Sequence, residues 1–208
     1  NGGVKLAKID LKKENKEYYY PSAREVSLVD LPEMKFLMID GQGDPNNSPE
    51  YQNAMETIFP VSYKTKFISK KEKSQDYVVM PLEGLWWSDK MEEFSTDDRS
   101  SWKWTVMIRQ PDFINQPIIN MAIKELEKKK DLPSINKLRF ESFNEGQSAQ
   151  IMHIGPYGEA EAPNVHKLHE FIENNGYQLK GKHHEIYISD LRRTKPEKLK
   201  TVIRQPYE

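Results

Sequence analysis

The sequence contains no cysteine among its 208 residues. This absence excludes disulfides, thiolate nucleophiles and cysteine-ligated zinc, and it is consistent with a reducing compartment. No apolar run approaches the roughly 18 residues that a membrane helix needs. The first residues, NGGVKLAKIDLKKE, lack the apolar core of a signal peptide. We therefore expect a soluble, cytoplasmic protein that has no membrane partner.

The chain also lacks an excess of charge of either sign. Lys and Arg total 31 against 32 Asp and Glu, which gives a net charge of −1. This balance provides no electrostatic reason to expect DNA or RNA as a partner. Residues 1–24 are too short a segment for a DNA-binding helix-turn-helix. We expect no nucleic-acid partner, and the sequence indicates no particular oligomeric state.

The familiar catalytic and metal-binding motifs are missing as well. There is no HExxH, no P-loop, no GxGxxG and no GxSxG. His166 and His169 have helical spacing, and His183 and His184 precede Glu185, but adjacent residues on a strand point to opposite faces. This pattern favours exposed or hydrogen-bonded histidines over a zinc site. We therefore predict that the protein uses no metal ion and no organic cofactor.

What the sequence does contain is a set of short internal echoes. TVMIRQP at 105–111 recurs as TVIRQP at 201–206, MIDGQG at 38–43 matches HIGPYG at 153–158, and PLEGLWWSD at 81–89 matches HHEIYISD at 183–190. The three matches occur in the same order, which indicates an internal duplication. In this alignment Glu83 corresponds to Glu185.

Residue patterns between the echoes predict the secondary structure. Alternating apolar residues indicate strands, and a helix starts at Ser48-Pro49 with Pro60 expected to kink or end it. The remaining predicted elements are strands at 76–87 and 101–111 paired antiparallel, a polar loop at 88–100, a hairpin turning at 144–146, a helix at 161–176, and two final strands.

These elements predict an α+β fold. Two β-α-β-β units, related by a pseudo-two-fold axis, form an antiparallel sheet with helices on one side and a central aromatic cleft. Residues 1–24 form an N-terminal arm or short helix packed by its tyrosines. Residues 25–208 form a single domain, with a first half at about 25–111, a linking helix at 112–131 and a second half at about 137–208.

Strand periodicity places the candidate carboxylates among aromatic residues. Glu83 shares a face with Trp87, and Glu185 shares a face with Tyr187. A carboxyl group that loses hydration beside aromatic rings has a raised pKa unless it is paired. The pattern leaves open whether Glu185 is a functional acid or the partner of a nearby arginine such as Arg192. Likewise, only one of the two adjacent tryptophans at 86 and 87 can face a given cleft.

The segments YVVMPLEGLWW, WTVMIRQPDF, MHIGPYG, HHEIYISDLRRTKPEKLKTVIRQP and MIDGQGDPN together resemble the GyrI-like small-molecule-binding superfamily. They are most similar to its stand-alone bacterial branch, related to cyclopropanoid cyclopropyl hydrolases. The resemblance runs from about Asp10 onward, and it implies the duplicated fold with an aromatic cleft and a functional glutamate at Glu185. The sequence departs from the branch at Leu191, where proline is usual, and at Pro60.

The resemblance also implies a function. The protein would bind flat aromatic small molecules and hydrolyse the cyclopropane ring of DNA-alkylating cyclopropanoid compounds, which is a detoxification of xenobiotics. Glu185 would be the general base that activates water, and Tyr187 would orient that water or stabilise the released phenolate. The predicted ligand-binding residues are Trp87, Trp104, Trp102, Tyr157, Tyr51, Glu83 and Tyr63.

Two other functions remain open at this point. The same cleft would serve a non-catalytic sponge or sensor for aromatic or cationic ligands, with Glu185 as the counter-charge. A gyrase-inhibitor-like role in binding another protein is the second alternative, although the sequence shows no concentrated acidic run that would form a docking surface.

Overall fold

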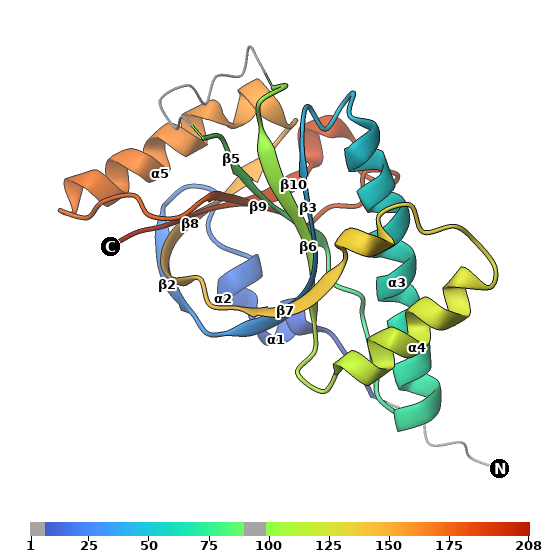
Figure 1. Cartoon of the computed structure of the whole chain (residues 1–208). Helices are drawn as coiled ribbons and strands as arrows, with labels where there is room; N and C mark the ends of the chain where they lie inside the picture. Colours follow the sequence, from blue (N-terminus) through green and yellow to red (C-terminus); the bar gives the residue numbers. More distant parts are fainter. Residues whose placement is uncertain (1–6, 90–98) are drawn as a thin grey trace.

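The computed structural model describes residues 7–89 and 99–208 (Figure 1). Most of the polar loop predicted at 88–100 lies outside the described residues. Within the described residues, none of the helices combines the length and the apolar character that a membrane span requires. The architecture is α+β, with one curled antiparallel sheet and helices packed against it (Figure 1).

Eight strands form this sheet in the order β2-β8-β10-β9-β5-β6-β3-β7, and every neighbouring pair is antiparallel. The strands are β2 (Ser27–Leu31), β3 (Met34–Gln42), β5 (Leu82–Trp87), β6 (Lys103–Gln110), β7 (Arg139–Phe143), β8 (Gly146–Ile154), β9 (His183–Tyr187) and β10 (Lys200–Pro206). A separate parallel pair joins β1 (Lys8–Ile9) to β4 (Asp76–Tyr77).

The helices are α1 (Leu11–Glu14), α2 (Lys16–Tyr19), α3 (Pro49–Lys73), α4 (Gln116–Glu127) and α5 (Ala162–Asn174). Short 3-10 turns η2 (Ile135–Lys137), η3 (Gly158–Glu161) and η4 (Pro196–Lys198) complete the described elements. α3, α4 and α5 pack outside the curl of the sheet, whereas α1 and α2 lie inside it (Figure 1). The expectation of helices on one side therefore holds for the three long helices only.

The predicted antiparallel pairing of β5 with β6 is confirmed, but the predicted hairpin at 144–146 is wrong. β7 pairs with β3 and β8 pairs with β2 and β10, so the two strands on either side of this turn lie at opposite ends of the sheet order. Thus β2 of the first half pairs with β8 of the second, and β7 of the second half pairs with β3 of the first. The duplication itself stays a prediction.

α3 continues through Pro60, so of the two predicted effects of this residue an end of the helix is wrong, and a kink stays a prediction. The start is as predicted, because the Tyr51 amide donates to the Ser48 side-chain oxygen at 3.4 Å. A proline inside a helix costs about 3 kcal/mol. Ile58 and Val61 flank Pro60 and are fully buried against the sheet, and this burial offsets the lost backbone hydrogen bond.

The sheet has two faces with different contents. The outer face carries Trp86, Trp104 and Ile108, which belong to the main apolar core under α3 and α4. The inner face carries Met107 and Leu85 in a smaller apolar cluster. Because directly opposed residues in an antiparallel pair share a face, the strand register assigns every sheet residue to one of these faces.

The N-terminal arm closes the inner face. Tyr19 is 2% exposed, and its hydroxyl accepts a hydrogen bond from Arg109 Nη1 at 2.9 Å. Arg204 Nη2 donates to the backbone oxygen of Tyr18 at 2.8 Å, and Gln150 Nε2 donates to that of Glu17. The arm is therefore joined to both halves of the sheet by charge-assisted hydrogen bonds.

Candidate functional site

Glu185 lies on the outer face of β9, which is the face that Trp86 occupies on the neighbouring strand β5. Its side chain is largely buried, with the residue 9% exposed, and His183 Nε2 lies 3.2 Å from its Oε2. Gly84 stands directly opposite on β5. A Cβ at this glycine would come within 2.6 Å of Trp86 Nε1, so the missing side chain creates the room in which Glu185 and Trp86 sit.

A second carboxyl group, that of Glu161, meets Glu185. The 3-10 turn η3 before α5 delivers it, and the Gly158 amide donates to its Oε2 at 2.8 Å. Burial, and after it the nearby charge of Glu185, raise the pKa of Glu161 to about 9. Glu161 therefore carries a proton at neutral pH.

Tyrosines surround the carboxyl pair. Burial raises the pKa of Tyr51 to about 12, with Glu185 and Tyr157 contributing, and Tyr157 is shifted upward by burial and by both glutamates. Burial and Glu185 together hold the pKa of Tyr187 well above its usual value. All three phenols are thus neutral hydrogen-bond donors near a carboxylate.

The aromatic rings also contact one another. The Tyr187 hydroxyl accepts a hydrogen bond from Trp86 Nε1 at 3.1 Å, which leaves its own proton for donation. Tyr51 stacks on Trp86 at 6.2 Å, and Trp102 meets Trp86 edge to face at 5.9 Å. Tyr157 packs edge to face on Tyr187 at 5.5 Å. The result is an aromatic enclosure around two acids, with flat surfaces suited to stacking a planar ligand.

The structure brings together five of the residues predicted from the sequence: Glu185, Tyr187, Tyr51, Trp102 and Tyr157. Trp104 lies next to them but is fully buried, with its ring against the edge of Tyr51 at 5.2 Å. Trp104 therefore packs against Tyr51 from within the core. Its predicted role in direct ligand contact stays a prediction, as do the roles of the other five.

Three predicted residues lie elsewhere. Trp87 and Glu83 are on the inner face of β5, opposite to Glu185, because the register pairs Glu83 with Ile186 and Gly84 with Glu185. Their placement in one cleft with Glu185 is therefore wrong, and so is the correspondence of Glu83 to Glu185, since equivalent residues would share a face. Tyr63 is 48% exposed on a part of α3 beyond Pro60.

Sequence reasoning missed Glu161 and left Trp86 undecided. Glu161 sits in an acidic stretch at a helix start, GEAEAP, which has the composition of an exposed first turn. Only the docking of η3 on the sheet buries it to 7% exposure. Alternation along the strand predicts that Trp86 and Trp87 point to opposite faces, but it does not say which of the two faces carries the site.

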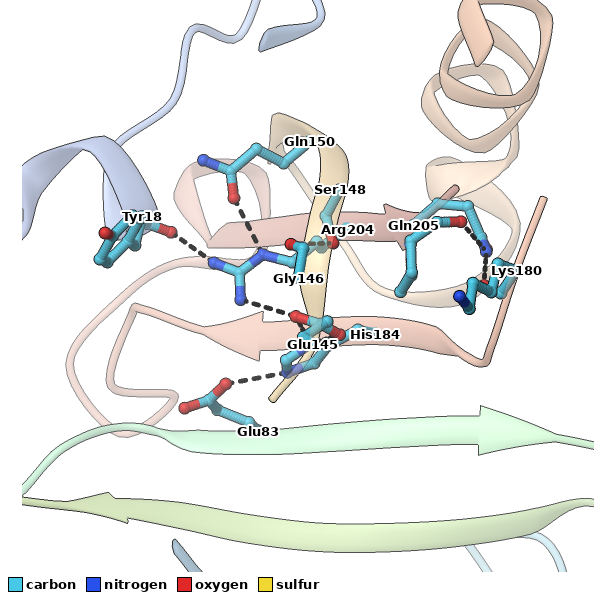
Figure 2. A network of polar contacts seen from close by, with 11 residues as sticks. Tyr18, Glu83, Glu145, Gly146, Ser148, Gln150, Lys180, His184, Arg204 and Gln205 are labelled. Atoms are coloured by element: carbon cyan, nitrogen blue, oxygen red, sulfur yellow. Dashed lines mark hydrogen bonds and ion pairs between the residues drawn. The ribbon is translucent and has the colours of Figure 1, made fainter. Parts of the chain in front are cut away.

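A separate polar network fills the inner face (Figure 2). His184 Nε2 lies 2.8 Å from Glu83, and its Nδ1 lies 2.7 Å from Glu145. Arg204 Nη1 lies 3.1 Å from Glu145, and its Nε donates to Gln150. Burial opposes the charge on His184, but Glu145 and Glu83 prevail and raise its pKa to about 9. This network joins the two halves to the N-terminal arm through Tyr18 (Figure 2).

Across residues 7–89 and 99–208, His, Asp and Glu side chains nowhere gather in a group of three or more that could hold a metal ion.

Comparison with known proteins identifies relatives along most of the chain. The family model described as the GyrI-like small molecule binding domain matches residues 24–208. An uncharacterized conserved protein from Listeria innocua is 41% identical, with a TM-score of 0.89 over 97% of this chain and 100% of that one. No curated protein matches.

Two further structures bear on the type of activity and on the fold. A hydrolase from Listeria innocua is 39% identical with a TM-score of 0.86, again over 97% of this chain and 100% of that one. The EcmrR C-terminal domain is 15% identical with a TM-score of 0.55, over 88% of this chain and 97% of that one, and it shares the fold.

Proposed function

Because this chain belongs to the GyrI-like small molecule binding family, we propose that it binds flat aromatic molecules over the Glu161–Glu185 pair and hydrolyses those with a strained, electrophilic ring. The single observation that carries the proposal is the carboxyl pair itself. Burial and the neighbouring carboxyl group of Glu185 raise the pKa of Glu161 to about 9, so Glu161 carries a proton at neutral pH and is available as a general acid beside a second carboxyl group. The hydrolase from Listeria innocua, at 39% identity, supports the same class of reaction.

Binding comes first in this mechanism. Tyr51, Tyr157 and Trp102 are each half-buried, so part of every ring is open to solvent while the rest is fixed by neighbours. A planar aromatic ligand gains dispersion and stacking energy over such rings, typically about 0.5–1.5 kcal/mol per pair beyond burial. The ligand then excludes water from the carboxyl pair, which strengthens the electrostatic interactions beneath it.

The chemical step follows from the charges. The substrate class is a conjugated ketone with an attached cyclopropane, as in the DNA-alkylating cyclopropanoid compounds. Glu185 removes a proton from a water molecule, the water oxygen bonds to the ring methylene, and the strained carbon–carbon bond breaks. Its electrons move to the ketone oxygen, which becomes a phenolate, and Glu161 protonates that oxygen. Transfer of the proton from Glu185 to Glu161 restores the pair, and the net change is the addition of one water.

In this mechanism Tyr187 has a supporting role. Its hydroxyl is held by Trp86 Nε1 at 3.1 Å and its proton is available. The raised pKa keeps it neutral, so it acts as a hydrogen-bond donor to the attacking water or to the developing phenolate and does not itself lose a proton.

The test is turnover of a duocarmycin-like compound that carries an intact cyclopropane, followed by mass spectrometry for the gain of one water. Replacing Glu185 with Gln removes the base, and the rate should fall by about 10²–10⁴-fold. Glu159→Gln is the matched control, because Glu159 lies in the same turn as Glu161 and is exposed. Hydrolysis that continues unchanged in Glu185→Gln refutes the general-base role.

A second function is favoured by the same buried charge. A non-catalytic sponge or sensor would use the carboxyl pair to hold a flat cation, since a cation over aromatic rings and beside a carboxylate is doubly stabilised. In that case the cyclopropane compound would bind without product, and a flat cationic dye would bind more tightly than its neutral analogue. Glu185→Gln would then weaken the binding of the dye, and no reaction rate would be affected.

A further inference from the structure

A pocket of about 480 Å³ opens at the edge of the sheet where β3 and β5 end and β6 and β7 begin. Its main lining residues are Asp40, Glu50, Trp87, Lys103, Lys137 and Arg139, and we refer to it as the Trp87 pocket. The volume falls within the range of small-molecule sites, which is about 300–1,000 Å³. The strand residues among them lie on the inner face, as the pairing of Trp87 with Lys103 shows. The pocket is therefore separate from the Glu161–Glu185 pair.

One cation, Lys182, lies against the Trp87 indole beside the residues that line this pocket. Lys182 Nζ lies 3.4 Å from the centroid of the Trp87 ring, and within the described parts of the chain no carboxylate forms an ion pair with it. Burial lowers the pKa of Lys182, and the nearby charge of Arg139 adds to this effect while Asp40 opposes it. An ammonium group that is partly desolvated near another cation is stabilised when an anion arrives.

The other three cations have partners that a ligand can replace. Lys103 pairs with Asp89 at 2.7 Å, Lys137 pairs with Glu50, and Arg139 pairs with Asp40 at 3.0 Å. The Asp89 side chain is 76% exposed and that of Asp40 is 58% exposed. Exposed ion pairs contribute little, typically below about 1 kcal/mol. A ligand carboxylate can take over one of these cations at small cost.

We propose that the Trp87 pocket is a second ligand site, which takes flat aromatic anions such as aryl carboxylates. The aromatic rings of the ligand stack on Trp87, and its carboxylate binds Lys137, Arg139 and Lys182. Arginine and carboxylate form paired, planar hydrogen bonds that fix the orientation of a ligand lying on an aromatic wall.

The two sites use neighbouring residues but opposite faces of the sheet. Trp86 belongs to the Glu185 site and Trp87 to the pocket, and the same alternation separates His183 from Lys182. Neither member of the carboxyl pair is among the residues that line the pocket. Occupation of the Trp87 pocket therefore does not require the carboxyl pair, and the two sites can be tested independently.

The experiment is isothermal titration of the full chain with 2-naphthoate. 2-Naphthamide is the uncharged control, because it has the same rings without the negative charge. Lys137→Gln removes a partly exposed cation from the pocket, and Trp87→Leu removes its aromatic wall. Glu185→Gln is the matched variant at the other site.

We expect 2-naphthoate to bind the unaltered protein at one site and to bind at least tenfold more tightly than the amide. Lys137→Gln should weaken binding about tenfold, which is the usual effect of losing one charge-assisted contact. Trp87→Leu should also weaken binding, up to about tenfold, because it removes the stacking surface. Glu185→Gln should leave the affinity unchanged. The proposal is overturned by equal affinities for naphthoate and naphthamide, by unchanged affinity in Lys137→Gln, or by loss of binding in Glu185→Gln. Lys137 is exposed enough that its variant will fold, so each of these results is decisive.

Discussion

Replacing His184 with Gln should remove a pH-dependent part of the stability of this protein. In the folded state His184 lies between Glu83 and Glu145 and is fully buried (Figure 2), and its pKa is about 9 against an unperturbed value of 6.5. The folded state thus binds this proton more tightly than the unfolded state does. The stabilisation is complete below pH 6.5 and is lost as the pH rises through about 9.

The size of the effect follows from the shift. A difference of 9 − 6.5 in pKa corresponds to about 3 kcal/mol at about 1.4 kcal/mol per unit. Across this pH range, the free energy of unfolding of the unaltered protein should fall by about 3 kcal/mol more than that of His184→Gln. The variant should be less stable at low pH, because Glu83 and Glu145 lose their shared cation.

Urea unfolding followed by circular dichroism, at several pH values, measures this difference. Other groups titrate in the same range, and Glu161 is one of them. Subtracting the variant's curve from that of the unaltered protein removes their contributions. His166→Gln is the control, since His166 is an exposed histidine on α5. Parallel curves for His184→Gln and the unaltered protein would show that His184 is not held as a cation, and the reasoning would fail.

Three further predictions test other parts of the structure. In the unaltered enzyme kcat/KM should fall as the pH rises through about 9, because Glu161 then loses the proton that it donates. Glu161→Gln should abolish this fall. A pH profile of the variant with the same fall above about pH 9 argues against this role. Gly41→Ala should lower the free energy of unfolding by about 1–3 kcal/mol, measured by thermal or urea unfolding, because a Cβ at Gly41 would lie 2.1 Å from the Trp104 ring. The fluorescence of Trp104 should shift as well. A variant as stable as the unaltered protein would contradict this packing. Tyr19→Phe should cost about 1–3 kcal/mol, because Arg109 loses a buried acceptor, and protease resistance of residues 7–20 should fall; unchanged resistance would show that the arm is held by other contacts.

Local residue patterns carried much of the secondary structure. The Ser48-Pro49 start of α3, the amphipathic stripe of α4 and the antiparallel pairing of β5 with β6 depend on neighbours within a few residues. Alternation along a strand also predicted that Glu185 and Tyr187 share a face. These features follow from capping chemistry and from the two-residue period of a strand, both of which are properties of short segments.

Long-range burial decided what the site contains. The sequence alone determined a family, a strand that presents Glu185, and a set of aromatic residues able to surround it. Only the tertiary structure showed that Glu161 meets Glu185, that Trp86 and not Trp87 shares its face, and that β7 leaves β8 to pair with β3. A carboxyl group becomes an acid of high pKa only when another segment removes its water, and no pattern of adjacent residues specifies which distant segment does so.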